Sequence, residues 1–380
     1  MTNFPVKEFE TIRTPFYYYD LSLLHETLIE LKAASNFPGF KVHYAIKANA
    51  NPLILQEIKE AGLGIDAVSG GEIAQALKLG FDPKKIVYAG VGKSDEEIEM
   101  ALLNQIGCLN VESEAELLII EQIAKRLAKV APITLRINPN IDAHTHKYIT
   151  TGLNENKFGI SPLILERLVN YVINSDSLDL KGIHFHIGSQ ITENEPFVML
   201  CDFINNLQKE YEAKGIKFQT INVGGGLGID YDNPDAHPIP DFKTYFNVFH
   251  QHLKIFEGQE LHFELGRSIV AQCGSLITKV LYVKEGLKKK FAIVDAGMTD
   301  LIRPALYQAH HLIQNLTSQG PESTYDVVGP ICESSDVFGT DEVLNQVRRG
   351  NLLALRSAGA YGEIMASRYN LRQLPGSFAK

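Results

Sequence analysis

Short apolar runs alternate with amphipathic stretches along the first two thirds of the chain. The first five runs begin 21 to 24 residues apart, and the stretches between them carry apolar residues at three- and four-residue spacing. A buried strand followed by an amphipathic helix, repeated in this way, is typical of βα units. The predicted strands are Val42–Ile46, Ile65–Val68, Ile86–Val91, Leu109–Val111, Ile133–Ile137, Gly182–Ile187, Thr220–Val223 and Leu261–Glu264, and the clearest helices are Pro52–Ala61, Gly71–Leu79, Asp95–Leu103 and Glu112–Leu127.

The number of βα units decides between two α/β architectures. A doubly wound open sheet is the competing arrangement, but eight units, rather than about five or six, favour a closed (β/α)8 barrel of the TIM type. In such a barrel the functional side chains stand at the carboxyl ends of the strands. The residues that follow each apolar run are therefore the first candidates for chemistry.

The pattern changes after Arg267, where β-like segments alternate with Gly and Pro. We predict a second, mostly-β domain there, with helical spacing only over Asp341–Arg348. The β-prone segment Thr14–Tyr19, which precedes a predicted helix over Leu21–Lys32, is expected to join that domain rather than the barrel. The predicted β segments are Val270–Val283, Phe291–Val294, Asp326–Val328 and Leu352–Ala354. The predicted domains are residues 1–20 (N-terminal strand), 21–266 (barrel) and 267–380 (β domain).

Composition places the chain among ordinary globular proteins. Of its 380 residues, 45% are hydrophobic and 21% are charged, which excludes a disordered chain or a collagen-like repeat. Its 36 basic and 45 acidic residues give a formal charge of −9 without a dense basic run, so we expect no nucleic-acid partner. No membrane-spanning stretch or secretory leader is recognisable, and four widely spaced cysteines indicate reduced thiols. We therefore expect a cytoplasmic protein without a membrane partner.

Unusual polar residues follow several of the predicted strands. Lys47, after the first strand, suits a Schiff-base lysine because a fixed, partly desolvated amine can lose its proton, although an isolated lysine at a barrel rim has a simpler structural explanation. His184 and His186 share a face of the sixth strand and fit a metal pair, a ring against a planar cofactor, or core histidines. A second pair, His144 and His146, stands in a polar segment and is expected to be solvated.

The last two barrel strands end in glycines and in a carboxylate. The run Gly224–Gly226 would let backbone N–H groups approach an anion such as phosphate, although tight turns also need glycine. Glu264 needs a partner, either a pyridinium N–H or the nearby Arg267, which would otherwise bind a carboxylate. The residues alone leave these alternatives open.

Three further groups of candidate residues stand in the predicted β domain. Arg303 precedes Tyr307 in one segment, Cys332 is followed by Glu333 in a turn-rich loop, and Tyr361 stands beside glycine. Taken singly, each group has a structural explanation that needs no chemistry.

Together the motifs resemble the fold-type III pyridoxal phosphate (PLP) decarboxylases, in order from Phe16 to Tyr369. The motifs are Tyr44-Ala-Ile-Lys47-Ala-Asn, His184-Phe-His-Ile-Gly-Ser-Gln190, Gly224-Gly-Gly, Glu264-Leu-Gly-Arg267, Cys332-Glu-Ser-Ser-Asp336 and Ala360-Tyr-Gly362. The segments His146–Gly152, Asn156–Gly159 and Cys332–Phe338 are similar to the diaminopimelate branch of that family. The family usually has proline where this chain has Leu265, and we expect little effect because leucine can adopt the same φ.

The resemblance implies a role for each motif. Lys47 would hold PLP as a Schiff base, His186 would stack on its ring, and Glu264 would keep the pyridine nitrogen protonated. Cys332 would return a proton to the α-carbon after CO2 leaves. The other cofactor-binding residues would be Ser189, Gly224, Gly225, Gly226, Gly266, Arg267 and Tyr361. The substrate would be bound by Arg267, Arg303, Tyr307, Glu333 and Tyr361, with Asp66, Arg136 and His184 in support.

The resemblance also implies a reaction and an assembly. The reaction would be decarboxylation of meso-2,6-diaminopimelate to L-lysine, the last step of lysine biosynthesis, in a homodimer whose neighbouring subunit supplies the Cys332 loop and Tyr361. Ornithine, arginine and carboxynorspermidine rank behind it, because two arginines suit a substrate with a distal carboxylate. An amino-acid racemase, a barrel metallohydrolase built on His184 and His186, and a non-catalytic relative fit fewer motifs. We expect no metal.

Overall fold

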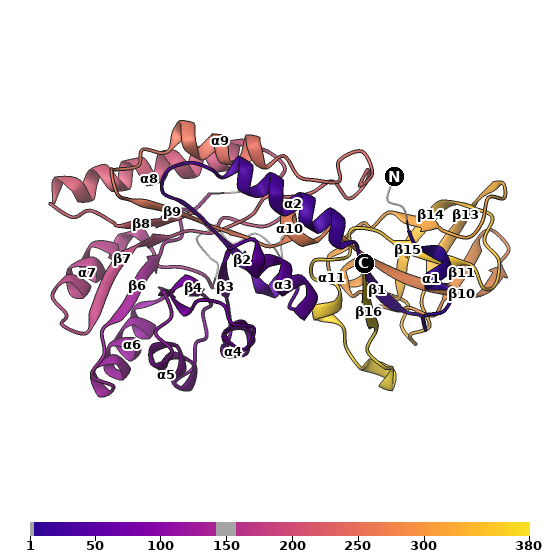
Figure 1. Cartoon of the computed structure of the whole chain (residues 1–380), viewed down its shortest axis with the longest axis horizontal. Coiled ribbons are helices and arrows are strands. Elements are labelled where there is room, and N and C mark those ends of the chain that lie inside the picture. The colour runs from indigo at the N-terminus through magenta and orange to yellow at the C-terminus, as the bar shows by residue number, and fades with distance from the viewer. Residues whose placement is uncertain (1–3, 142–156) are drawn as a thin grey trace. The chain divides into compact units, whose positions relative to one another are not determined.

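The computed structural model describes residues 4–141 and 157–380 (Figure 1). The predicted pair His144 and His146, and the motif over His146–Gly152, lie outside the described residues. The chain falls into two compact units: a barrel unit of residues 28–228 and 241–266, and a β unit of residues up to 27, 229–240 and 267–380. Among the residues described, no helix combines the length and the apolar character needed to cross a bilayer.

Eight parallel strands close into a barrel in the barrel unit, which confirms the predicted fold (Figure 1). Strand β2 closes the barrel, because His43 pairs in register with Gly64 on β3 and with Glu264 on β9. The strands are β2 (Phe40–Ala45), β3 (Gly64–Ala67), β4 (Ile86–Tyr88), β5 (Cys108–Val111), β6 (Ala131–Arg136), β7 (Leu178–His184), β8 (Thr220–Asn222) and β9 (Glu260–Leu265). The long helices are α2 (Leu21–Ala34), α3 (Pro52–Glu60), α4 (Gly70–Lys78), α5 (Asp95–Leu103), α6 (Glu114–Arg126), α7 (Pro162–Ile173), α8 (Glu195–Ala213) and α9 (Phe242–His252).

Polar caps fix where the barrel helices begin. The side chains of Ser69, Ser94 and Ser113 accept N–H groups from the first turns of α4, α5 and α6. Asn51 caps α3 in the same way, ahead of a proline in the first turn. Because each cap stands at the end of a strand-to-helix loop, the loops that carry the candidate residues are held at both ends.

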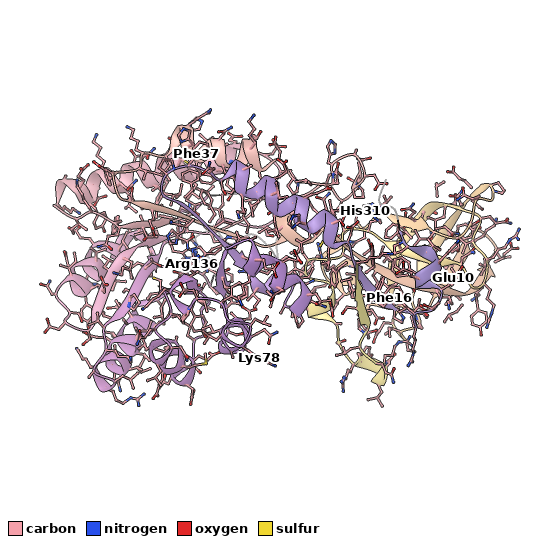
Figure 2. The ribbon with its side chains drawn as sticks, viewed as in Figure 1. Glu10, Phe16, Phe37, Lys78, Arg136 and His310 are labelled. Carbon is pink, nitrogen blue, oxygen red and sulfur yellow. The ribbon has the colours of Figure 1, made fainter. Side chains whose placement is uncertain are left out.

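The β unit contains an eight-stranded sheet that includes the N-terminal strand, as expected. Strand β1 pairs antiparallel with β10 and parallel with β16. Phe16 of β1, labelled in Figure 2, belongs with Phe9 and Ile277 to the hydrophobic core of the unit. The strands are β1 (Phe16–Tyr19), β10 (Gly274–Glu285), β11 (Lys290–Val294), β12 (Ile313–Asn315), β13 (Glu322–Val328), β14 (Val337–Asn345), β15 (Leu352–Leu355) and β16 (Gly376–Ala379). Its short helices are α1 (Val6–Phe9), α10 (Arg267–Val270) and α11 (Arg303–Tyr307).

The helical spacing expected over Asp341–Arg348 is wrong, because strand β14 runs through most of this segment. Antiparallel pairing places Val343 opposite Thr324 and Asn345 opposite Glu322 on β13. A partner strand satisfies the backbone hydrogen-bonding groups along β14, and this tertiary pairing outweighs a short apolar spacing that fits either element.

Residues 229–240, which the sequence pattern assigns to the barrel, lie in the β unit. Arg356 Nη2 donates to Asp235 at 2.9 Å, and Gln272 donates to the backbone oxygen of His237. These contacts hold the segment that carries Tyr231. The predicted domain ranges stay predictions, and this segment is one place where the compact units depart from them.

Candidate active site

The amine of Lys47 pairs with a buried carboxylate at the end of the first barrel strand. Lys47 lies in a single turn, η1 (Ile46–Ala48), directly after β2, and its Nζ is 2.5 Å from Oδ2 of Asp66 on β3. The Asp66 side chain is fully buried, whereas 36% of the Lys47 side chain is exposed. Burial and the charge of Glu264 raise the pKa of Asp66, and Lys47 opposes that shift. The second oxygen of Asp66 is buried without a hydrogen-bond partner among the residues described.

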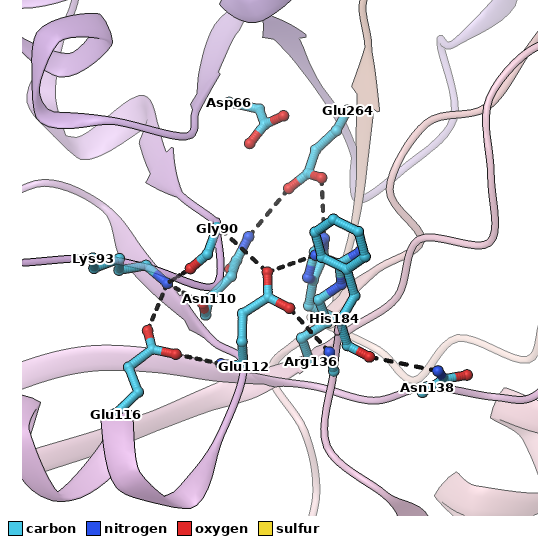
Figure 3. Close-up of polar contacts among 12 residues, drawn as sticks. Asp66, Gly90, Lys93, Asn110, Glu112, Glu116, Arg136, Asn138, His184 and Glu264 are labelled. Atoms are coloured by element: carbon cyan, nitrogen blue, oxygen red, sulfur yellow. Dashed lines mark hydrogen bonds and ion pairs between the residues drawn. The ribbon is translucent and has the colours of Figure 1, made fainter. Parts of the chain in front are cut away.

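Glu264 on β9 receives three hydrogen bonds from inside the barrel. His184 Nε2 lies 3.0 Å from its Oε2, and Asn110 Nδ2 donates to its Oε1 at 3.2 Å (Figure 3). Asn222 Nδ2 donates to the same Oε1 at 2.7 Å. Burial would raise the pKa of Glu264, but His184 and Lys47 outweigh it and hold the pKa well below its ordinary value. A carboxylate offers about four acceptor positions, so the ionised Glu264 keeps one for a further donor.

The two amide donors are themselves held in one orientation. Thr134 Oγ1 donates to Asn110 Oδ1 at 2.6 Å, and Asn222 Oδ1 accepts the N–H of Gly224 at 2.9 Å. Each contact occupies the amide oxygen, so the NH2 group faces Glu264. The side chains of Asn110, Thr134 and Asn222 are buried. The barrel interior is therefore arranged to stabilise a negative charge on Glu264.

Arg136, predicted to support the site, forms a buried ion pair. It lies on β6 in the barrel unit (Figure 2), and its Nη1 donates to Glu112 Oε1 at 2.5 Å. The other oxygen of Glu112 accepts the N–H of Gly159 at 3.0 Å, and the guanidinium lies 4.7 Å from the centre of the Phe158 ring. Arg136 thus connects β6 to the segment that precedes α7.

Close backbone contacts explain the glycine run after β8. A Cβ on Gly225 would lie 2.0 Å from the backbone oxygen of Glu264, and a Cβ on Gly224 would lie 2.4 Å from that of Phe185. The N–H of Gly225 donates to Nδ1 of His186 at 3.2 Å. The N–H groups of Gly224 and Gly225 therefore both donate to side chains of the barrel. Glycine is needed at both positions because a neighbouring backbone oxygen lies too close for a Cβ.

His186 is a neutral imidazole. Its Nδ1 accepts a hydrogen bond, so this nitrogen carries no proton. Burial, with the positive charges of Arg136 and Lys47, lowers the pKa of His186 to about 3. Nε2 of His184 is directed at Glu264. This bonding favours a ring packed against a planar ligand over the metal-pair interpretation of the two histidines.

Gly266 lets the end of β9 approach the turn that holds Lys47. A Cβ at Gly266 would lie 3.0 Å from the Cβ of Ala48 and 3.2 Å from that of Ala45. Leu265 pairs in register with Tyr44 and is fully buried. Leucine at this position continues the barrel strand to its last residue.

Two buried arginines meet at one tyrosine in the β unit. Nη1 of Arg267 and Nη1 of Arg303 donate to the hydroxyl of Tyr231 at 2.6 and 2.7 Å. The guanidinium of Arg267 also lies 5.0 Å from the centre of the Tyr361 ring in the same chain. The structure therefore brings together three of the predicted substrate residues, and Tyr307 stands at the other end of the short helix that begins with Arg303.

Cys332 is the one exposed thiol among the four cysteines. Its backbone N–H donates to Asn370 Oδ1 at 3.2 Å, and Glu333 Oε1 accepts from the hydroxyl of Tyr369 at 2.6 Å. Burial raises the pKa of Cys108 and of Cys201 to about 12, so these thiols stay protonated. Of the four cysteines, Cys332 alone presents its thiol to solvent.

Sequence reasoning missed several polar residues that this geometry makes important. They are Asn110, Glu112, Thr134, Asn222 and Tyr231. A usable signal existed for the barrel residues, because a polar residue inside an otherwise apolar strand must find a buried partner. Tyr231 carried no such signal, since it follows the glycine run in a polar segment.

Comparison with known proteins agrees with this geometry. The family model described as "Pyridoxal-dependent decarboxylase, pyridoxal binding domain" matches residues 28–271, which include every barrel strand. The diaminopimelate decarboxylase of Bacteroides thetaiotaomicron is 56% identical over 376 residues, covering 99% of this chain and 97% of that protein. The diaminopimelate decarboxylase of Helicobacter pylori is 45% identical over 370 residues, covering 96% of this chain and 89% of that protein.

Solved structures extend the likeness to the fold. The crystal structure of diaminopimelate decarboxylase from Helicobacter pylori complexed with L-lysine has 43% sequence identity and a TM-score of 0.94, covering 99% of this chain and 93% of that chain. The M. jannaschii enzyme in co-complex with L-lysine has 35% identity and a TM-score of 0.91, covering 99% and 89%. By sequence and by fold, the chain belongs to the diaminopimelate decarboxylases, a branch of the pyridoxal-dependent decarboxylase family.

Proposed function

We propose that this chain decarboxylates meso-2,6-diaminopimelate to L-lysine and CO2, the last step of lysine biosynthesis, with PLP bound in the barrel. The observation that carries the proposal is Glu264, a buried and ionised carboxylate with three donors and one acceptor position left. A pyridinium N–H is the donor that fits this position. When bound, the cofactor supplies an electron sink for the charge left on the α-carbon as CO2 departs.

Lys47 would bind the cofactor at its aldehyde, and His186 would pack on its ring. The Lys47 amine is exposed enough to accept a covalent link, and Asp66 balances its charge while it is protonated. The neutral ring of His186 would pack on one face of the pyridine. For the phosphate we propose Gly226, Ser189 and Tyr361, with Gly224 and Gly225 providing the close backbone approach rather than their N–H groups.

A second group of residues would hold the far end of the substrate. Arg267 and Arg303 provide buried positive charge for the distal carboxylate, and Tyr307 and Glu333 would bind the distal amino acid group alongside them. Two arginines also favour diaminopimelate over ornithine, which has no distal carboxylate. With its far end bound, the substrate is positioned so that only the α-carboxylate is lost.

Cys332 would complete the reaction by moving a proton. With the charge left by the departing CO2 stabilised by the cofactor, Sγ of Cys332 would give the α-carbon the proton that replaces CO2. The thiolate left behind is reprotonated from water, which the exposure of this thiol allows. Atoms balance, since one CO2 leaves and one proton is gained.

A substrate panel tests the proposal. Holoenzyme supplied with meso-diaminopimelate should release CO2 and L-lysine, with kcat/KM at least about 100-fold above that for L-ornithine, because buried groups left unpaired penalise the smaller substrate. LL-diaminopimelate, L-arginine and carboxynorspermidine are the matched comparisons. A preference for ornithine, or interconversion of stereoisomers without CO2 release, would overturn the proposed reaction.

We further propose a cytoplasmic homodimer in which each active site takes its Cys332 loop from the neighbouring subunit. The exposure of Cys332 and Glu333 supports a role toward a second copy. The family resemblance implies that Tyr361 also comes from the neighbouring subunit. Because its ring centre lies 5.0 Å from the Arg267 guanidinium of its own chain, we propose instead that Tyr361 serves the site of its own subunit.

Mixing two inactive variants tests the shared site. Lys47→Ala and Cys332→Ala should each be inactive, and a subunit-exchanged mixture should recover about a quarter of wild-type activity, because half the dimers are heterodimers with one intact site. The activity of the mixture before and after exchange is the measurement. Absence of recovery, with heterodimers demonstrated by mass, would contradict sharing.

A further inference from the structure

The hydroxyl of Tyr231 is shared by two buried cations. Arg267 and Arg303, which are 7% and 5% exposed, each direct one Nη1 at this oxygen. Two positive charges that meet at one point repel, and burial adds to the free-energy cost of each. The acceptor that they share is a phenol rather than a carboxylate. An anion beside the Tyr231 oxygen would relieve this repulsion.

The O–H group of Tyr231 is still available to donate a hydrogen bond. A phenol has one O–H donor and about two acceptor positions, and the two guanidinium groups occupy the acceptor positions. No acceptor for the proton of Tyr231 is found in the part of the chain that the structure describes, and the side chain is only partly buried. Burial raises the pKa of Tyr231, but Arg267 and Arg303 outweigh it and lower the pKa, which makes the O–H a stronger donor.

The Tyr231 ring is fixed by its surroundings. The ring of His311 packs against it edge-on, with centroids 5.3 Å apart and an interplanar angle of 83°. Nδ1 of His311 is in turn 2.9 Å from the backbone oxygen of Arg356, whose side chain holds Asp235 of the same segment. A rigid ring keeps the oxygen at the point where the two guanidinium groups converge.

We propose that Tyr231 is a third binding group for the distal carboxylate of the substrate and determines specificity for substrates that carry one. Its O–H donates to the carboxylate while its oxygen holds the guanidinium groups of Arg267 and Arg303 in place. This inference rests on the proposed function. The effect of Tyr231 should depend on the distal carboxylate of the ligand. L-lysine keeps this carboxylate of diaminopimelate, and 1,5-diaminopentane lacks it.

Replacing Tyr231 by phenylalanine removes the hydroxyl and keeps the ring. Calorimetric binding of L-lysine to the PLP-loaded enzyme should weaken about 10- to 100-fold, the range expected for a lost hydrogen bond to a charged group. Binding of 1,5-diaminopentane should change by less than about twofold, because no group of it meets Tyr231. In turnover of diaminopimelate, KM should rise more than kcat falls.

Tyr245→Phe is the matched control, because the hydroxyl of Tyr245 on α9 is buried without a partner among the described residues. This control should leave the binding of both ligands unchanged. Equal weakening of both ligands by Tyr231→Phe would show a merely structural role, and unchanged L-lysine binding would show no role; either result overturns the inference alone. A wild-type enzyme that binds 1,5-diaminopentane as tightly as L-lysine would overturn the substrate assignment itself.

Discussion

Replacing Lys47 by alanine is expected to leave the protein colourless and without activity. Lys93, whose side chain is buried, gives a comparison in the barrel unit: its Nζ donates to Gly90, Asn110 and Glu116, at 2.7, 2.8 and 2.6 Å (Figure 3). These contacts use all three of its N–H groups. Lys47, paired with Asp66 and partly exposed, is the amine that a cofactor aldehyde can reach. Without it no covalent link forms, and both binding and turnover should fail.

The measurement is the visible spectrum of purified protein with PLP added, followed by borohydride reduction and mapping of the labelled peptide. Wild-type protein should be yellow and carry the label on Lys47. Lys41→Ala is the control, since Lys41 is an exposed lysine on β2, the strand that leads into the turn of Lys47, and this variant should keep both signals. A label on any other lysine in wild-type protein, or colour retained by Lys47→Ala, would contradict the assignment.

The barrel could be predicted from sequence because its strands are buried on both faces. Ile65, Ile133 and Leu261 are fully buried, and runs of such residues mark parallel strands without any need for alternation. The ends of the elements were harder to predict. Strand β7 begins at Leu178, four residues before the predicted start at Gly182, because Asp179 and Lys181 make its first half look like a loop.

The candidate site was suggested by its motifs taken together rather than by single residues. Lys47 and Cys332 taken alone each had a structural explanation, and their roles, which the family resemblance implies, remain proposals. The contacts that tune the site were not predictable, because they join residues distant in sequence. Asn110 and Glu264, for example, are 154 positions apart. An asparagine in an apolar run shows that a buried partner exists, but only the closed barrel shows that this partner is Glu264.

The second prediction with a large effect concerns Glu264. Glu264→Gln should lower kcat about 100- to 1,000-fold, the range seen when one preorganised electrostatic contact is removed from an active site. An amide has a single oxygen, and it cannot accept from His184, from Asn110 with Asn222, and from the cofactor at once. The variant also lacks the negative charge that would keep the pyridine nitrogen protonated. Single-turnover decarboxylation and the spectrum of the PLP-loaded variant are the measurements.

Glu260→Gln is the matched control, because the same carboxylate-to-amide change is made on β9 at a partly exposed residue. It should keep kcat within about twofold. The pH profile adds an independent check. Since the pKa of Glu264 lies well below its ordinary value, Glu264 stays ionised as pH falls from about 8 to about 5, and its protonation should not produce an acid limb in kcat there. A Glu264→Gln variant with the kcat of the wild type would contradict the role of Glu264 on which the proposed function depends, because a neutral side chain would then serve the pyridine nitrogen equally well.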